Sequence, residues 1–193
     1  MNTPELSAPA LPLLLMSIAG PFGALDVVLF HLWKFRLYSR PSARAETITH
    51  ILRGVTFAIG AYLLATFRVS GAWFWWVGAL FAFDFVNNLI DAALESRSRA
   101  ELGGLPTAEY VVHIIGSTFA GAITIAFFTT SWANRSGPSE LISNHGLLPN
   151  WLIVNGQILA ASAAVLTAVE LGLFLRSWTA EARKAAPPCC DVW

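Results

Sequence analysis

The chain has 193 residues, of which 55% are hydrophobic and only 12% are charged, and its formal net charge is zero. Soluble domains carry about 25% charged residues, so this composition indicates an integral membrane protein. The mean hydropathy of +0.58 agrees with that interpretation. Zero net charge offers no basic surface, so we expect no nucleic-acid partner. The two cysteines, Cys189 and Cys190, are adjacent and exclude a disulfide framework.

Five long apolar stretches follow one another, and each can cross a hydrocarbon core of about 30 Å. Segments rich in Pro, Gly and Asn separate them, as at Arg40-Pro41-Ser42 and Asn144-His145-Gly146. The sequence predicts one all-α transmembrane domain over residues 1–178, an integral membrane five-helix bundle, followed by a disordered tail at 179–193. The expected spans are 10–34, 43–67, 71–95, 108–132 and 150–177.

The basic residues are distributed asymmetrically between the two ends of the spans. All Lys and Arg residues except Arg68 and Arg135 flank the first or third connection or follow the last span. The positive-inside rule therefore predicts an N-terminus outside and a cytoplasmic C-terminus. We expect a multi-pass protein of a bacterial-type cytoplasmic (inner) membrane.

A weak internal repeat relates the second and fourth spans. Residues 45–52 (AETITHIL) resemble residues 108–115 (AEYVVHII), and both contain Glu-x-x-x-His, as Glu46/His50 and Glu109/His113. Residues four apart share a helix face, so each pair can reach one centre. The sequence predicts two helical hairpins in weak parallel repeat plus a fifth helix, a pattern that is common in transporters and also suits a two-metal site.

The predicted topology brings the acids and histidines of four spans close to the inner boundary. Asp84, Asn88, Asp91 and Glu95 lie four, three and four residues apart and form one stripe. Asp26 and His31 are five apart and point about 140° from each other in an α-helix. We expect only one of these two to face the common centre, unless Pro21 distorts the helix.

Unpaired charges at this depth cost several kcal/mol, so their convergence indicates a bound cation. Imidazoles and carboxylates together suit iron, zinc or manganese. Two histidines with about four carboxylates match the ligand chemistry of di-metal helical bundles, although the spacing here is one residue longer than their Glu-x-x-His and implies no family membership. We predict two metal ions. The expected ligands are Asp26, His31, Glu46, His50, Asp91, Glu109 and His113.

A metal centre near the headgroup level suits an enzyme whose apolar, lipid-like substrate enters from the membrane. An iron pair would oxidise or hydroxylate the substrate, whereas zinc or manganese would activate water for hydrolysis. Arg53 lies seven residues after Glu46, on the same face, where it could hold an anionic headgroup. We expect Arg53, Asp84 and Asn88 to be the catalytic residues.

Other interpretations of the same residues stay open. The acids and histidines could form a metal-free network of buried salt bridges and protons, or ligate heme, although three histidines ringed by acids fit heme poorly. The chain could be a cation or proton carrier, but the outer halves of the spans hold few polar residues. It could also be a structural subunit of a larger complex, and so small a bundle is compatible with a homo-oligomer.

Overall fold

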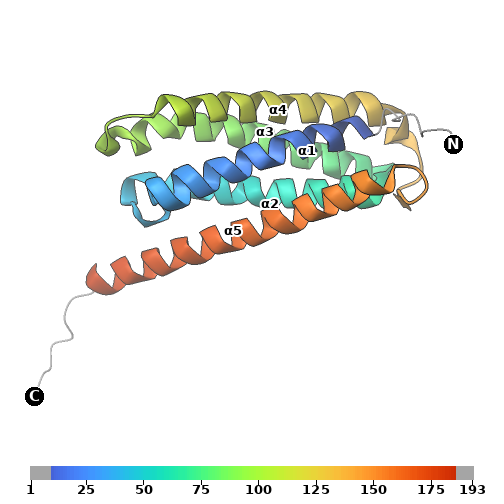
Figure 1. Cartoon of the computed structure of the whole chain (residues 1–193). Coiled ribbons are helices and arrows are strands. Elements are labelled where there is room, and N and C mark those ends of the chain that lie inside the picture. The colour runs from blue at the N-terminus through green and yellow to red at the C-terminus, as the bar shows by residue number, and fades with distance from the viewer. Residues whose placement is uncertain (1–9, 186–193) are drawn as a thin grey trace, which may run out of the picture.

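Five long helices form an elongated bundle in the computed structural model, which describes residues 10–185 (Figure 1). All five are long and apolar enough to cross a membrane, which confirms the predicted helical class and number of candidate spans. Cys189 and Cys190 lie outside the described residues. The helices are α1 (Leu11–Asp26), continued by η2 (Val27–Lys34), then α2 (Arg44–Thr66), α3 (Ala72–Ser98), α4 (Thr107–Ser131) and α5 (Asn150–Ala185).

Short elements close both ends of the bundle. Strands β1 (Phe67–Val69) and β2 (Leu141–Ser143) pair antiparallel where α2 turns into α3 and α4 leads to α5, a pairing that the sequence did not predict. At the same end, Gly71 adopts a φ of 57°, and its N–H donates to Asn134 O. Short helical turns make the remaining connections: η3 (Leu37–Ser39), η4 (Pro41–Ala43), η5 (Ala100–Leu102) and η6 (Trp132–Ser136).

The helices do not pack in chain order. α1 packs mainly against α4 and α5, and α2 packs against α3 and α5, so that α5 lies between the two helices of the first hairpin. The α1–α4 and α3–α2 interfaces would be equivalent under the predicted repeat, which relates α1 to α3 and α2 to α4. The packing is compatible with that repeat, except that α5 separates α1 from α2.

The interior of the bundle changes character along its length. Towards the β1–β2 end it is apolar, and Phe74 and Phe127 stack there with ring centroids 5.2 Å apart, beside Leu13, Met16 and Leu152. Towards the opposite end the buried side chains are mostly polar or charged. The apolar half supplies close packing, and the polar half contains the candidate site.

The last turns of α5 are tied to the start of α2. Arg44 forms an ion pair with Glu181, and its guanidinium lies 4.7 Å from the centre of the Trp178 ring. The helix continues to Ala185, so helical structure extends into the segment that the sequence predicted as a disordered tail.

Helices α2 and α5 approach each other closely at Gly54. A Cβ atom there would overlap Thr167 Oγ1 and approach Thr167 Cβ to 3.1 Å. We expect Gly54→Ala to lower the free energy of unfolding by about 1–3 kcal/mol, as overpacking does, measured as a lower Tm in detergent.

Gly172→Ala is the matched control, because Gly172 is exposed on α5 and an added Cβ meets nothing within 4 Å. Its Tm should stay equal or rise slightly, since alanine favours helix over glycine by about 0.5–1 kcal/mol. Equal Tm values for the two variants would contradict the close crossing.

Candidate metal centre

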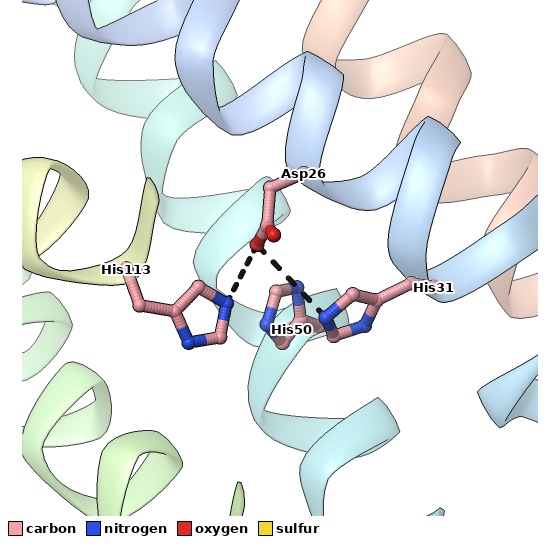
Figure 2. Close-up of side chains that lie close together, drawn as sticks. All are labelled: Asp26, His31, His50 and His113. Atoms are coloured by element: carbon pink, nitrogen blue, oxygen red, sulfur yellow. Dashed lines mark hydrogen bonds and ion pairs between the residues drawn. The ribbon is translucent and has the colours of Figure 1, made fainter. Parts of the chain in front are cut away.

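The end of the first span is a π-helical turn, and this turn shapes the site. Residues 27–34 follow π-helical hydrogen bonding, and Phe35 N donates to Phe30 O at 3.0 Å. The hydrogen bonds of a π-helical turn join residues five apart, so Asp26 and His31 lie on one face and both point to the same centre (Figure 2). The α-helical spacing predicted only one of them. The cause is the π-helical turn rather than Pro21, which lies earlier, inside α1.

Four side chains from three spans form the first grouping. Ligand atoms of Asp26, His31, His50 and His113 all lie within 4.8 Å of one another. Asp26 Oδ2 is 2.8 Å from His113 Nε2 and 3.9 Å from His31 Nε2, and the His31 and His50 rings are 3.7 Å apart at their centroids. Figure 2 shows the Asp26 carboxylate pointing towards the three rings.

His31 also faces the two repeat-related glutamates, which form the second grouping. Its Nε2 lies 3.7 Å from Glu46 Oε1 and 4.0 Å from Glu109 Oε1. All three side chains are at most 1% exposed. The acid of each Glu-x-x-x-His pair therefore meets His31 of the first span.

Arg99 forms ion pairs with both of these glutamates. Its Nη1 donates to Glu46 Oε2 at 2.8 Å, its Nε donates to Glu109 Oε1 at 3.1 Å, and its Nη2 also contacts Glu109. Burial alone would lower the pKa of Arg99, but hydrogen bonds and charge attraction from Glu109 and Glu46 raise it above its usual value. The guanidinium therefore stays protonated although it is 0% exposed.

Sequence reasoning missed Arg99 because it counted this residue among the basic flanks of a connection. A signal was present: Asp84, Asn88, Asp91 and Glu95 continue to Arg99 at spacings of four, three, four and four. These positions share one helix face, so the stripe of α3 leads directly to the arginine.

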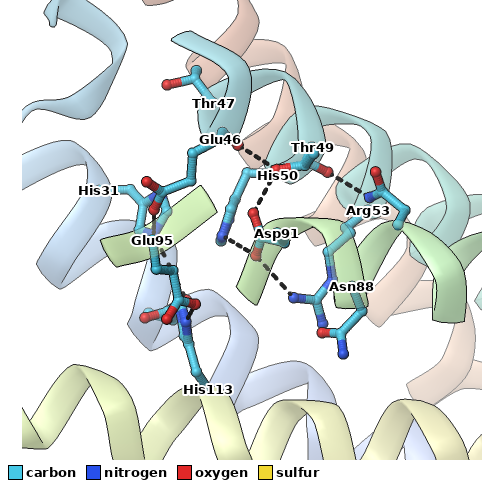
Figure 3. Close-up of polar contacts among 12 residues, drawn as sticks. His31, Glu46, Thr47, Thr49, His50, Arg53, Asn88, Asp91, Glu95 and His113 are labelled. Atoms are coloured by element: carbon cyan, nitrogen blue, oxygen red, sulfur yellow. Dashed lines mark hydrogen bonds and ion pairs between the residues drawn. The ribbon is translucent and has the colours of Figure 1, made fainter. Parts of the chain in front are cut away.

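The third grouping joins α3 to α4 (Figure 3). It consists of Asp91 and Glu95 of α3 and His113 of α4. His113 Nδ1 contacts Glu95 Oε1, on the side of the ring opposite to the Asp26 contact. Asp91 Oδ2 is 3.1 Å from His50 Nε2, and the Thr49 hydroxyl donates to Asp91 Oδ1. His113 therefore links the first grouping to the third.

The contacts of the two hairpins correspond to each other. His50 of α2 meets Asp91 of α3, and His113 of α4 meets Asp26 of α1. The three groupings adjoin each other, so the expected ligands come together as one cluster with several centres.

Many polar atoms of this cluster are buried without a hydrogen-bond partner. Within residues 10–185, such atoms include both ring nitrogens of His31 and one carboxylate oxygen of Glu170, which lies 4.0 Å from His31 Nδ1. Buried polar atoms are normally hydrogen-bonded or bound to an ion, so these groupings could hold a cation. Asp26 Oδ1 and Glu46 Oε1 also lack a hydrogen-bond partner, whereas His50 Nε2 and Glu95 Oε1 have only their ion-pair contacts with Asp91 and His113.

The residues predicted as catalytic lie beside the cluster rather than within its groupings. Arg53 Nη1 is 3.5 Å from Asp91 Oδ2, and Asp84 accepts a hydrogen bond from Thr56 at 2.6 Å. Asn88 donates to Ser117 at 2.9 Å and so joins α3 to α4. The structure therefore gives Asn88 a contact that joins two helices.

A cavity of about 270 Å³ adjoins the cluster. Asp26, His50, His113 and Glu170 lie at one end of it, and Arg53 and Asp84 also line it. Most of the remaining wall is apolar and is formed by α1, α2, α4 and α5.

Comparison with known proteins adds no assignment: no protein-family model, curated protein or solved structure gives a significant match to this chain.

Arg99 should be required for folding, because it is the cation that joins two buried carboxylates. Breaking a buried ion pair from one side costs about 3–5 kcal/mol, so we expect Arg99→Met to lower Tm strongly. The exposed Arg97→Met variant is the control and should unfold like the wild type. Partial recovery of Tm in the Arg99→Met/Glu109→Gln double variant would show that the unpaired charge causes the loss. An unchanged Tm in Arg99→Met would contradict the assignment.

The spacing of Asp26 and His31 can be tested by changing the length of the π-helical turn. Deletion of Leu29, which is exposed, leaves the two residues four apart, and an α-helical turn would keep them on one face, so metal retention measured by elemental analysis should persist. Insertion of one alanine after Leu29 leaves them six apart, about 120° from each other in an α-helix, so metal retention should fall while the helical circular dichroism persists. Equal metal content in the two variants would contradict a role for the turn.

Proposed function

We propose that the chain is a membrane-embedded metalloenzyme whose histidine–carboxylate cluster holds two metal ions and acts on an apolar, lipid-like substrate. The observation that carries the proposal is the convergence of imidazole nitrogens and buried carboxylate oxygens from all five candidate spans, several of them without a hydrogen-bond partner. Neutral imidazole and carboxylate are the donors preferred by zinc, iron and manganese.

The charge of the cluster supports two ions. Six buried carboxylates face two guanidinium groups, those of Arg99 and Arg53. With neutral histidines, and without Asp84, which is only partly buried and lies outside the groupings, this leaves four negative charges, which two divalent cations would offset. The carboxylates are Asp26, Glu46, Asp91, Glu95, Glu109 and Glu170.

The distances also suit coordination. Two ligands bonded at about 2.1 Å to one ion lie no more than about 4.2 Å apart. The separations of 2.8 and 3.9 Å from Asp26 to His113 and His31 fall within that limit, as does the 3.1 Å from His50 to Asp91. His113 can use Nε2 for an ion next to Asp26, while Glu95 holds Nδ1 and orients the ring.

The negative charges of Glu46 and Glu109 are already partly compensated, unlike those of the other acids. Arg99 already binds both of them, so the His31–Glu46–Glu109 grouping needs a further cation less than the others do. Two ions near Asp26, His50, Asp91 and His113 are therefore favoured over an ion held between the two glutamates.

The membrane arrangement follows from the basic residues. We propose that the end of the bundle with the α1–α2 and α3–α4 connections faces the cytoplasm in a bacterial-type inner membrane, because most Lys and Arg residues lie there. The cluster lies at this same end, near the headgroup level of the cytoplasmic leaflet.

The adjoining cavity favours an enzyme over a carrier. Its wall away from the cluster is mostly apolar, which suits an apolar substrate and offers few groups to a crossing ion. Iron in the cluster would support oxidation or hydroxylation of that substrate, and zinc or manganese would support hydrolysis. The main competing function is a metal-free proton network, which the same buried acids could form if they were protonated.

Metal analysis of purified protein tests the proposal. We expect about two equivalents of metal per chain, as two-metal sites hold. The expected result for His50→Ala and for His113→Ala is loss of most of this metal with the helical content retained, because the backbone hydrogen bonds stay within each helix.

His145→Ala is the matched control, since His145 is exposed in the loop before α5 and lies outside the cluster. It should keep wild-type metal content. Wild-type protein without stoichiometric metal, or ligand variants that keep it, would favour the metal-free network.

A further inference from the structure

The cavity beside the cluster extends along the bundle. Its lining runs from Val112 to Ile123 on α4 and from Leu159 to Glu170 on α5. Eleven residues of helix rise by about 16 Å, which gives the length of the cavity along the bundle. Its volume of about 270 Å³ is less than twice the roughly 150 Å³ that encloses one benzene ring. This volume therefore suits an extended chain better than a fused ring system.

Glycines keep part of this space open. A Cβ atom at Gly23 would meet nothing within 4 Å, and one at Gly116 would meet only Arg53 Nη2, at 4.0 Å. Both glycines line the cavity. Gly20 and Gly54 also line it, but side chains of neighbouring helices occupy the space beside them. Gly23 is exposed and lies where the cavity reaches the surface, and Gly116 is partly buried beside Arg53. We therefore expect larger residues at 23 and 116 to reduce the space in the cavity.

The two ends of the cavity differ in chemistry. His50, His113, Asp26 and Glu170 surround one end, whereas residues 19, 123 and 159, which are Ala, Ile and Leu, mark the other. Arg53 and Asp84 add polar atoms to one wall near the middle. An occupant should therefore have one polar end and one long apolar part.

We propose that this cavity binds the unbranched hydrocarbon chain of a single-chain amphiphile, with its polar head at the cluster and its tail towards the middle of the bundle. The small volume selects one chain, and the polarity of the two ends sets its direction. A lipid of the leaflet nearest the cluster has the same direction, head at the boundary and tail towards the bilayer centre. This inference deepens the proposed function and rests on it for the role of the cluster.

The direction of the bound hydrocarbon chain determines which of its bonds can react. The cluster lies next to the head of the amphiphile, so the reacting bond is at or near the polar head. The terminal methyl group lies about 16 Å away along the cavity, beyond the reach of side chains in the cluster.

Photo-crosslinking in membranes tests both the occupant and its direction. The probes are two unbranched fatty acids, one with a diazirine at the last carbon and one with a diazirine next to the carboxyl group. We expect the first to label the region of Ile123 and Leu159, and the second to label the region of Val112 and Leu166. The reverse pattern would overturn the proposed direction.

Variants separate cavity labelling from labelling by bulk lipid. Gly116→Leu and Gly23→Leu should each reduce the cavity labels at least tenfold, because the new side chain fills the space. Gly172→Leu is the control, since Gly172 is exposed and does not line the cavity. Labels confined to outward residues such as Ile125, Ile158 and Val165, and unchanged in all variants, would overturn the proposal.

Metal content measured on the same samples distinguishes the two proposals. Cavity labelling without metal would refute the metal centre and keep the chain-binding cavity. Stoichiometric metal without cavity labelling would refute the cavity and keep the centre.

Discussion

The burial of six carboxylates at one end of an apolar bundle is the constraint on which the rest of the structure depends. Removing an ion from water costs several kcal/mol even after the protein relaxes, so each acid needs a partner. Arg99 provides one for Glu46 and Glu109 and joins α2 to α4 through them. The other acids face imidazoles, and both ring nitrogens of His31 and Nε2 of His50 lack hydrogen bonds, which is the arrangement that a cation would complete. The stacked aromatic half of the bundle supplies the packing that this end lacks.

Two departures from a regular four-helix arrangement create the site. The π-helical turn after Asp26 brings His31 onto the same face, where it meets both the first grouping and the repeated glutamates. The position of α5 between α1 and α2 brings Glu170 to the cluster and leaves the adjoining cavity. Direct packing of α1 on α2 would close that cavity, so the fifth helix makes the space as well as part of its wall.

The sequence predicted the five helices because span length and hydropathy depend only on local composition. It also placed His50 and His113 together with Asp91, because a spacing of three or four residues fixes a helix face. It did not place Asp26 and His31 on one face, since the hydrophobic pattern carries no sign of a π-helical turn. It missed Arg99 because a basic residue after a span usually marks the membrane boundary. The pairing of β1 with β2 depends on contacts between distant segments, which no local pattern encodes.

The cluster and the cavity affect each other through water. An empty cavity of this size next to His50 and Glu170 has room for water, which would screen the charges of the cluster. A hydrocarbon chain in the cavity would displace that water and lower the local dielectric constant, which strengthens every charge interaction at the polar end. Binding of the chain would then hold a reacting head group against a more strongly organised cluster. The apolar wall therefore contributes to the chemistry at its polar end, although none of its own side chains takes part in it.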